Sequence, residues 1–301
     1  RVLRTPLDPR ATFRDDPLRM LRAARFAAQL GFRLAPDLPP AMRELADRLR
    51  PPVVSVERVA DELWKLLRSP RPRLGLELLD AGGLLAVVLP EVAACQGVAQ
   101  GGWHPDDVYQ HTLATVERTP PQLLQRLAAL FHDVGKPATG PEGGHFPNHE
   151  QVGARLAAAA LRRLRASTSL TESVAKLVRL HLRPVFYDAS WTDGAVRRLA
   201  RAAGDLLWPL LDLARADVGA STYPHPEELD ELEARLRRVL AEEPDRFTPP
   251  ITGDDIMAAV GIGPGPAVGR IKAELEELVL DGVLPPEREA LLAYLRERAA
   301  T

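Results

Sequence analysis

Hydrophobic residues recur at intervals of three and four along most of this sequence, and polar residues fill the positions between them. This period is that of amphipathic α-helices, whereas strands would show alternation. Residues 1–14 show little periodicity and contain Pro6 and Pro9, so we expect them to be extended or looped. The pattern predicts helices over residues 17–30, 41–50, 56–67, 74–79, 84–89, 108–117, 123–131, 152–164, 174–182, 206–218 and 227–243, followed by a helix pair across a Gly-rich turn near residue 263. The sequence therefore predicts an all-α protein, an elongated array of helices in several parts.

The predicted helix over residues 17–30 has sequence signals at both ends. Asp16 is a suitable N-cap, Pro17 suits the first helical position, and Gly31 can end the helix in the left-handed conformation. Helical spacing buries one side and exposes the other: Met20, Ala23, Ala24, Ala27 and Leu30 are expected inside, and Arg19, Arg22 and Arg25 outside. Taken alone, this pattern indicates only a capped helix with a solvated basic face.

The stretch from Leu130 to Pro137 carries the clearest chemistry. The predicted helix over 123–131 delivers adjacent His132 and Asp133 side chains, and imidazole with carboxylate suits a divalent cation such as Mg, Mn, Fe, Co, Ni or Zn. Two residues cannot complete a metal site, so further ligands must come from elsewhere in the chain. The candidates, each in or beside a predicted helix, are His111, His149, His181 and Asp217. His104 and His145, which stand in loops, are left out of the ligand set.

Lys136 follows the His-Asp pair by one helical turn. Its ammonium group could hold a phosphate as a point charge, and Gly135 would let the backbone approach that phosphate. We therefore predict a catalytic group of His132, Asp133 and Lys136. A lone histidine is more often a core or surface residue, but the whole set in this order favours a metal site.

Composition is that of a soluble, cytoplasmic protein. No apolar run approaches the roughly 18 residues that span a bilayer, and the single Cys95 excludes an intrachain disulfide framework. The net charge is −2, yet residues 1–50 hold eleven Arg against six acidic residues. This local excess either faces phosphates or reflects a general preference for Arg, because only four of the 39 basic residues are Lys.

The order His111, His132-Asp133, Asp217 resembles the H…HD…D signature of the HD superfamily of metal-dependent phosphohydrolases, and His149 and His181 resemble the additional histidines of its two-metal members. The resemblance implies a helical HD domain that binds one or two divalent ions, for which Mn²⁺, Ni²⁺ and Mg²⁺ are the expected candidates. Related HD domains act as 2′,3′-cyclic phosphodiesterases and phosphatases on RNA ends.

A second resemblance covers nearly the whole chain. The segments 4–23 and 55–91, with Asp15-Asp16-Pro17-Leu18-Arg19 at the start of the capped helix, are similar to class II tRNA nucleotidyltransferases (CCA-adding enzymes) and bacterial poly(A) polymerases. In that family an E/D-D-x-x-R motif pairs with the incoming CTP or ATP. A carboxylate that accepts from an exocyclic amine and a guanidinium that donates in a fork can read a base edge. The resemblance implies nucleotide binding by Asp16, Arg19, Arg22 and Arg25.

The end of the chain resembles the tail of bacterial CCA-adding enzymes. Its Gly-rich turn lies between two predicted helices, the second of which begins near Pro266, and backbone amides at such a helix start can hold a phosphate without reading sequence. We expect Gly263, Gly265, Gly269 and Arg270 to contact RNA. The alternative is an ordinary turn in which Gly is needed only for positive φ.

We expect three parts: a neck and body with the nucleotide template and an RNA-binding surface (1–92), the HD domain (106–222) and a tRNA-binding tail (223–301). The sequence starts at Arg1 and holds no D-x-D pair for two Mg²⁺ ions, so we expect the C-terminal portion of a nucleotidyltransferase that cannot add nucleotides alone. The expected partner is the acceptor arm and 3′ end of tRNA. Two alternatives stay open: a stand-alone HD phosphohydrolase, and a non-catalytic RNA-binding scaffold. The sequence decides neither the oligomeric state nor the choice among A, CC, CCA and poly(A) addition.

Overall fold

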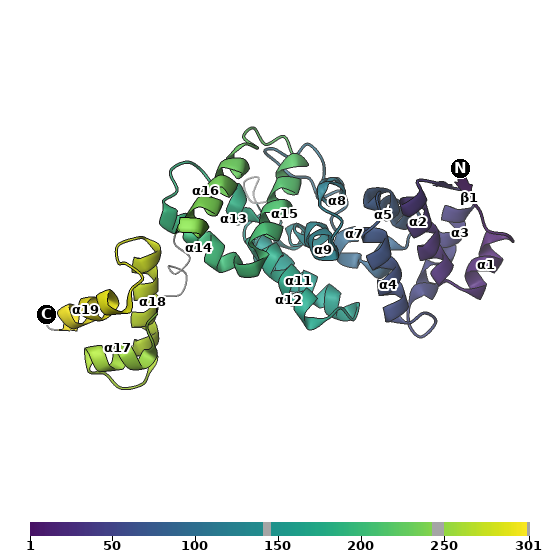
Figure 1. The fold of residues 1–301 in the computed structure, drawn as a ribbon. Helices are drawn as coiled ribbons and strands as arrows, with labels where there is room; N and C mark the ends of the chain where they lie inside the picture. The colour runs from purple at the N-terminus through teal and green to yellow at the C-terminus, as the bar shows by residue number, and fades with distance from the viewer. Residues whose placement is uncertain (141–145, 243–249, 300–301) are drawn as a thin grey trace. The chain divides into compact units, whose positions relative to one another are not determined.

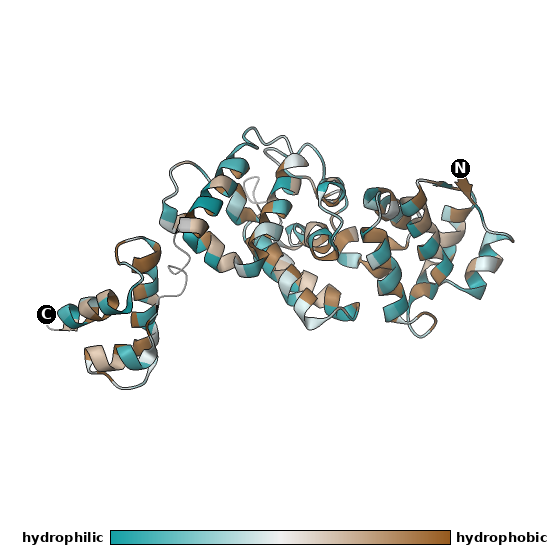
Figure 2. Cartoon of the chain, viewed as in Figure 1, coloured by the Kyte–Doolittle hydropathy of each residue, from teal (hydrophilic) through white to brown (hydrophobic). Residues whose placement is uncertain are grey.

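The computed structural model describes residues 1–140, 146–242 and 250–299, and these residues form an almost entirely helical protein (Figure 1). The only β-structure among them is one parallel pair of two-residue strands, β1 (Val2–Leu3) and β2 (Arg33–Leu34). Each helix carries hydrophilic and hydrophobic residues side by side, as its periodic sequence requires (Figure 2). The expectation of an all-α fold is confirmed.

The helices follow one another in three groups along the chain. The first group contains α1 (Pro9–Asp15), α2 (Leu18–Leu30), α3 (Leu38–Leu45), the 3-10 helix η1 (Ala46–Leu49), α4 (Val56–Leu67), α5 (Pro72–Ala81), α6 (Leu85–Val88) and α7 (Pro90–Ala93). The second contains α8 (Val108–Arg118), α9 (Leu123–Phe131), α10 (Lys136–Thr139), α11 (His149–Arg163), α12 (Thr168–Leu180), α13 (Leu182–Val185), α14 (Asp193–Ala203), the 3-10 helix η2 (Gly204–Leu206), α15 (Leu207–Gly219) and α16 (Glu228–Glu242). The third contains α17 (Gly253–Val260), α18 (Pro266–Leu280) and α19 (Arg288–Ala299).

Contacts divide the chain into two compact units. One consists of Arg1–Val185 with Trp208–Pro226, and the other of Phe186–Leu207 with Glu227–Thr301. Each has its own buried hydrophobic residues. The three-part division expected from the sequence, with boundaries near residues 92, 106 and 222, stays a prediction.

Helix α2 confirms most of its predicted signals. Asp16 Oδ1 accepts a hydrogen bond from the Leu18 backbone N–H at 3.2 Å, so Asp16 caps the helix although the helix itself begins at Leu18. Gly31 ends the helix with φ 68°, a left-handed conformation that Gly adopts without steric cost. Two burial expectations are wrong. Leu30 is 53% exposed, because the buried side of α2 is formed instead by Leu18, Met20, Leu21, Ala24, Ala27 and Ala28. Arg25, expected outside, has only 11% of its side chain exposed, because it pairs with Glu62 of α4.

Residues 9–15 are helical, which corrects the expectation of an extended segment. Asp8 caps α1 by accepting from the Ala11 backbone N–H at 2.9 Å, and Pro9 occupies the first turn, where a missing N–H has no cost. Phe13 is buried and α1 packs against α3. The helix expected over residues 41–50 also differs, since α3 already begins at Leu38 and the 3-10 helix η1 follows it.

The second group of helices builds the metal-ligand candidates into one core. Helix α9 contacts α8 and α12, and α11 and α12 pack closely against each other as a helical hairpin. His149 was expected just before a helix, but it is the first residue of α11, after Asn148 in the left-handed conformation. The predicted loop over 137–147 contains α10 at its start, and its remaining part includes His145 and its neighbours 141–144, which lie outside the described residues.

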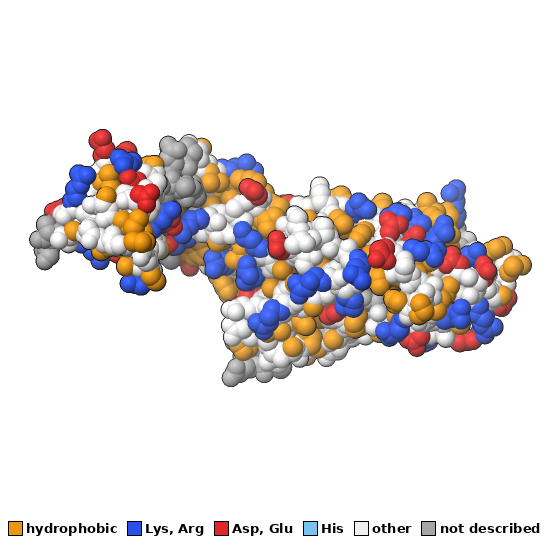
Figure 3. All heavy atoms as spheres, turned by 90° about the horizontal axis from the view of Figure 1, so that it is seen from below, with side chains coloured by type: hydrophobic (Ala, Val, Ile, Leu, Met, Phe, Trp, Pro, Cys, Tyr) orange, Lys and Arg blue, Asp and Glu red, His pale blue; other side chains and the backbone are white. Residues whose placement is uncertain are grey.

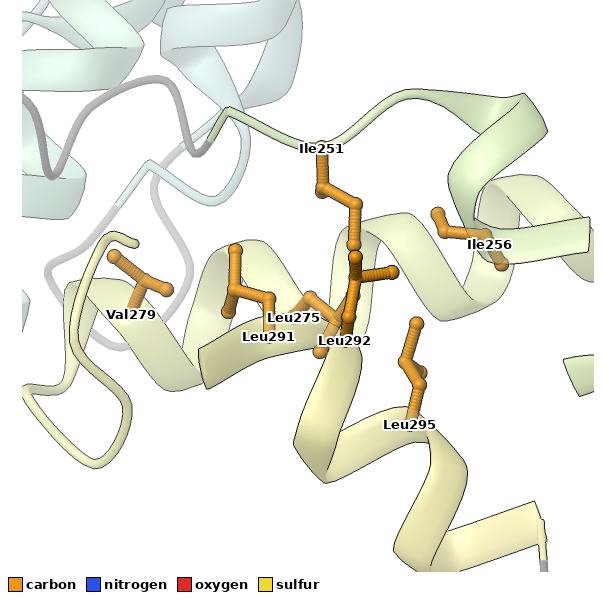
Figure 4. Close-up of a cluster of buried hydrophobic side chains, with 7 residues drawn as sticks. All are labelled: Ile251, Ile256, Leu275, Val279, Leu291, Leu292 and Leu295. Carbon is orange, nitrogen blue, oxygen red and sulfur yellow. The ribbon is translucent and has the colours of Figure 1, made fainter. Parts of the chain in front are cut away.

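The third group of helices has a small core of its own. Seven buried side chains meet there from α17, α18, α19 and the segment just before α17: Ile251, Ile256, Leu275, Val279, Leu291, Leu292 and Leu295 (Figure 4). Thr252 and Asp255 form a reciprocal capping box at the start of α17. The expected pair of helices across a Gly-rich turn is present as α17 and α18.

Within the described residues, no helix is both long and apolar enough to cross a membrane.

Candidate metal centre and nucleotide-template helix

Five elements bring the six predicted metal ligands together. His111 stands on α8, His132 and Asp133 follow α9, His149 opens α11, His181 follows α12, and Asp217 stands on α15. All six side chains are buried, with at most 8% of any residue exposed. Because buried ionisable groups are costly unless they are paired or bind a metal, this cluster requires a compensating partner.

The six residues divide into two groups, each with ligand atoms close enough to hold one ion. The first contains His111, His132 and Asp217. His111 Nε2 lies 2.8 Å from Asp217 Oδ1 and 3.3 Å from His132 Nε2. The second group contains Asp133, His149 and His181, in which Asp133 Oδ1 lies 3.4 Å from His149 Nε2 and 3.8 Å from His181 Nε2.

Asp133 joins the two groups. Its Oδ1 atom faces the second group, whereas its Oδ2 atom lies 3.2 Å from His132 Nε2 and 3.9 Å from His111 Nε2. A carboxylate in this position can give one oxygen to each of two neighbouring ions. The geometry therefore accommodates one ion in either group, or a pair that shares Asp133.

Backbone carbonyls orient the histidine rings. The Nδ1 atoms of His132, His149 and His181 each lie 2.7–2.8 Å from the carbonyl oxygen three residues earlier, and His111 Nδ1 lies 3.4 Å from Ala220 O. A ring that donates through Nδ1 presents a lone pair at Nε2, which is the arrangement found around protein-bound metals. The His149 Nε2 atom is buried and makes no hydrogen bond among the described residues, although it points into the group. An imidazole nitrogen that is buried and makes no hydrogen bond is suited to bind a cation.

Without a metal, the charges and the burial of the cluster shift the pKa values of its ionisable groups. Burial opposes a charge on His132, but the carboxylates of Asp133 and Asp217 outweigh it and raise the pKa of His132 to about 9. Burial also opposes ionisation of Asp133, yet His132 and Lys136 hold its pKa well below the usual range. His181 behaves in the opposite way, since burial and then the charge of His132 lower its pKa to about 4. The cluster is thus built for negative carboxylates around one positive charge.

Lys136 lies next to the metal-ligand candidates and is already engaged. Its Nζ atom donates to Asp133 Oδ2 at 2.7 Å and to Gln100 Oε1 at 2.6 Å. His104, which we left out of the expected ligand set, packs its ring against His111 with centroids 4.5 Å apart. Gln100 and His104 both belong to the segment before α8. No spacing signal marks them, because their place depends on how that segment folds over the cluster.

Gly135 has a packing role that differs from the one expected. A Cβ atom at this position would lie 2.0 Å from the carbonyl oxygen of His149 and 2.7 Å from the Gly153 backbone nitrogen. The chain at Gly135 therefore touches the backbone of α11, and only Gly permits this approach. Since α11 begins with His149, Gly135 helps to set the position of a candidate ligand.

The nucleotide-template candidates lie at the start of α2 and along it. Asp16 is paired with Arg58 of α4 at 3.6 Å, and Arg19 with Asp15 at 2.9 Å. Arg19 and Arg22 are exposed. Their side chains are available to a ligand at the surface of this unit.

Arg25 differs from the other template candidates because it is mostly buried and structurally engaged. Its Nε atom lies 2.5 Å from Glu62 Oε2 of α4, its Nη1 atom donates to Gln29, and its guanidinium lies 4.0 Å from the centroid of the Phe26 ring. The same carboxylate lies 4.0 Å from Arg22 Nε. Glu62 was missed by the sequence reading, since a buried partner on another helix leaves no local signal.

Comparisons with known proteins show which family has a similar sequence. An A-adding tRNA nucleotidyltransferase of Deinococcus radiodurans is 39% identical to the chain over 295 residues, which are 92% of the chain and 67% of the relative. The chain belongs to the tRNA nucleotidyltransferase family. A CC-adding tRNA nucleotidyltransferase of Thermus thermophilus is 40% identical over 301 residues, 94% of the chain and 67% of the relative.

Two segments of this tRNA nucleotidyltransferase family member match known domain families. Residues 31–96 match a family described as "Probable RNA and SrmB- binding site of polymerase A", and residues 104–235 match the HD domain. The crystal structure of the Bacillus stearothermophilus CCA-adding enzyme in complex with CTP has the same fold, with a TM-score of 0.68, 24% identity, and coverage of 100% of this chain and 66% of that one. The chain thus spans about two thirds of the length of these relatives.

The Gly-rich turn of this family member is open. Added Cβ atoms at Gly263, Gly265 and Gly269 would meet no atom within 4 Å, and positive φ is found instead at Gly261. Arg270 is exposed on α18. RNA binding by these four residues stays a prediction. The alternative, that Gly is needed for positive φ, does not explain Gly263 or Gly265, because neither residue has a φ in the left-handed region.

Proposed function

We propose that this chain supplies nucleotide selection and tRNA binding to a tRNA nucleotidyltransferase that uses ATP or CTP with Mg²⁺, and that its HD centre is a metal-dependent phosphohydrolase. Family membership supports the first part, together with a template helix that presents Asp16 and Arg19 at its exposed end. Its relatives include both an A-adding and a CC-adding enzyme at nearly equal identity, so the proposal covers addition to tRNA 3′ ends without choosing the nucleotide.

One observation carries the second part: four imidazole Nε2 atoms and two carboxylates converge in a buried space, with the other nitrogen of each ring held by a backbone carbonyl. A set rich in imidazole suits Mn²⁺ or Ni²⁺ better than Mg²⁺, which prefers oxygen ligands. A divalent cation bound there would lower the pKa of a water molecule and neutralise charge on a phosphoester. This argues against a scaffold that has lost its site.

The chain's own residues have separate parts in this reaction. Asp133 holds the two ligand groups together, and the backbone carbonyls keep the histidine rings in one tautomer. Lys136 holds the substrate as a point charge next to Asp133. To do so, its Nζ atom replaces the hydrogen bond to Gln100 with one to a phosphate oxygen. Deep burial excludes bulk water from these contacts.

Metal content and hydrolysis together test the HD proposal. Protein purified without added metal is analysed by plasma mass spectrometry and assayed on 2′,3′-cyclic AMP with Mn²⁺, Ni²⁺ or Mg²⁺. We expect one to two ions per chain, and loss of both metal and at least about 99% of hydrolysis in Asp133→Asn, which keeps the shape of the side chain. Asp61→Asn, an exposed aspartate paired only with Lys65, is the matched control. No metal and no hydrolysis in the unchanged protein would overturn the phosphohydrolase assignment.

The transferase proposal needs the full-length enzyme. Arg19→Ala should lower incorporation of CTP or ATP into tRNA by about 10- to 100-fold, because a fork of donors to the base edge contributes roughly 1–3 kcal/mol. Arg50→Ala removes another exposed arginine, which lies outside the template, and should leave incorporation unchanged. Equal incorporation by the Arg19 variant and the unchanged enzyme would exclude the template role.

A further inference from the structure

The α11–α12 hairpin holds a concentration of basic side chains that have no acidic partner. Over most of the described chain, Arg and Lys are paired with Asp or Glu or donate to backbone carbonyls. On this hairpin and the turn after it, the only ion pair of an Arg or Lys among the described residues is the one between Arg163 and Glu91. The remaining basic residues, for which the described structure gives no hydrogen bond or ion pair, are Arg155, Arg162, Arg165, Lys176, Arg179 and Arg183.

Acidic residues are scarce on the same segment. Residues 149–185 contain seven Arg or Lys and only two acids, Glu150 and Glu172, in a chain whose net charge is −2. Arg155 and Arg162 are seven residues apart on α11, two helical turns, so they lie on one side of that helix. Figure 3, which looks at the molecule from below, shows more Lys and Arg than acidic side chains over the middle of the molecule. Uncompensated charge of this kind produces a positive surface potential.

The hairpin leads to the metal centre. His149 is the first residue of α11 and His181 follows the last residue of α12, so the open end of the hairpin supplies both histidines of the second ligand group. At 1.5 Å per residue, Arg155 lies roughly 9 Å and Arg162 roughly 20 Å along α11 from His149.

We propose that the basic surface of the α11–α12 hairpin binds the phosphate backbone of single-stranded RNA and leads its 3′ end to the HD centre. This proposal rests on the phosphohydrolase function proposed above and names the part of the molecule that recognises a polymeric substrate. It adds an RNA contact outside the tail, whose residues 251–299 contain nine acids against five basic residues and so lack the basic excess of the hairpin.

The composition of the hairpin surface favours RNA over a lipid membrane. Among the described residues, large exposed hydrophobic side chains occur at eight positions, and none of them lies between residues 149 and 183. A helix that inserts into a membrane surface needs an exposed apolar face beside its basic one. The exposed residues near the closed end, Ser167, Thr168 and Ser169, are small hydroxyl residues that can donate to phosphate oxygens.

A double charge reversal, Arg155→Glu with Arg162→Glu, tests the proposal in the metal-loaded protein. Two substrates are compared: a ten-nucleotide RNA that ends in a 2′,3′-cyclic phosphate, and 2′,3′-cyclic AMP alone. We expect KM for the RNA to rise at least about tenfold. The slope of log KM against the logarithm of the salt concentration should fall by about 1.4, because two phosphate contacts are lost and each contributes roughly 0.7. Hydrolysis of 2′,3′-cyclic AMP should not change, because a mononucleotide does not reach these residues.

The matched control reverses two exposed and unpaired basic residues of the tail, Lys272→Glu with Arg296→Glu, and so changes the net charge by the same amount. Equal effects of the two double variants on RNA KM would overturn the hairpin assignment, since they would reflect net charge alone. Fluorescence anisotropy with the same RNA supplies a readout that does not need hydrolysis. If the unchanged protein hydrolyses neither substrate, the phosphohydrolase function fails, and anisotropy still decides the RNA contact. Loss of binding to phosphatidylserine vesicles, with RNA binding retained, would assign the surface to a membrane instead.

Discussion

The Nε2 atoms of His111 and His132 lie 3.3 Å apart, although both rings direct Nδ1 toward a backbone carbonyl. Two lone pairs at that distance repel each other unless a proton or a cation lies between them. With no metal bound, the carboxylates of Asp133 and Asp217 raise the pKa of His132 to about 9, so its ring carries an additional proton at neutral pH. Metal and proton thus compete for one position.

This competition predicts opposite pH dependences for the two forms of the protein. A His whose pKa rises from about 6.5 to about 9 on folding stabilises the fold below pH 6.5, and this stability is lost as pH rises through 9. With EDTA, the thermal unfolding midpoint should therefore fall between pH 6.5 and 9. With Mn²⁺ it should rise over the same window, because metal binding releases the proton. Differential scanning calorimetry in both buffers measures this, and parallel pH profiles would contradict the competition.

Substitution of Gly135 should disturb α11 without touching a ligand. In Gly135→Ala the new methyl would meet the carbonyl oxygen of His149 at 2.0 Å, so the two backbones must separate. We expect a loss of about 1–3 kcal/mol in unfolding free energy, typical of overpacking, and weaker binding of an ion by the second ligand group. Urea unfolding and metal titration measure the two effects.

Gly263→Ala is the control for that variant. Its Cβ would meet no atom within 4 Å and its φ is not positive, so stability should change by less than about 0.5 kcal/mol. Equal stability of the two variants would show that Gly135 is not needed for the approach to α11.

Glu62 should matter for stability more than its single charge suggests. Removing this buried carboxylate in Glu62→Ala leaves Arg25, whose side chain is 11% exposed, without its ion-pair partner. We expect a cost of about 3 kcal/mol in unfolding free energy, as for other broken buried pairs. Asp61→Ala, on the same helix, breaks only an exposed pair with Lys65 and should cost less than about 1 kcal/mol. A Glu62 variant as stable as the Asp61 variant would exclude the structural role of the Arg25 pair.

The tail core should unfold without loss of the metal centre. Leu291 is fully buried in it, so Leu291→Ala should cost about 2–5 kcal/mol, whereas Val283→Ala, which truncates a 65% exposed side chain, should cost almost nothing. Because the tail and the ligand candidates belong to different compact units, metal binding should persist in both variants. Hydrogen exchange measured by mass spectrometry would locate the loss, and exchange that also rises around His132 would contradict independent units.

The sequence predicts those parts of the fold that depend on local signals. The helix over 56–67 has the expected bounds in α4, because Ser55 caps it by accepting from the Arg58 backbone N–H and its hydrophobic face is continuous. The six ligand candidates could be identified by order and residue type, and the structure brings all six together. The presence of α1 could not be predicted, because two prolines and a short buried face outweighed the Asp8 cap in the pattern.

The partners of these residues could not be predicted, because they come from other elements. Nothing near Glu62 in the sequence indicates that its carboxylate faces Arg25, and nothing near Gln100 indicates a contact with Lys136. The packing role of Gly135 could not be predicted for the same reason: the need for Gly at this contact arises from the backbone of α11, 14 residues away at His149. Its expected role beside a phosphate stays a prediction. Long-range packing decides these contacts, whereas helical periodicity reports only which side of a helix is buried.

His111 and Asp217, which lie 2.8 Å apart, are separated by 106 residues in sequence. During synthesis, the first ligand group cannot exist until α15 has left the ribosome, long after α8 and α9 have formed. An ion captured earlier could be held only by the second group, whose last member is His181. The second candidate group is therefore complete in the growing chain before the first, and a nascent chain arrested between residues 181 and 217 would hold only the second of the two candidate metal positions.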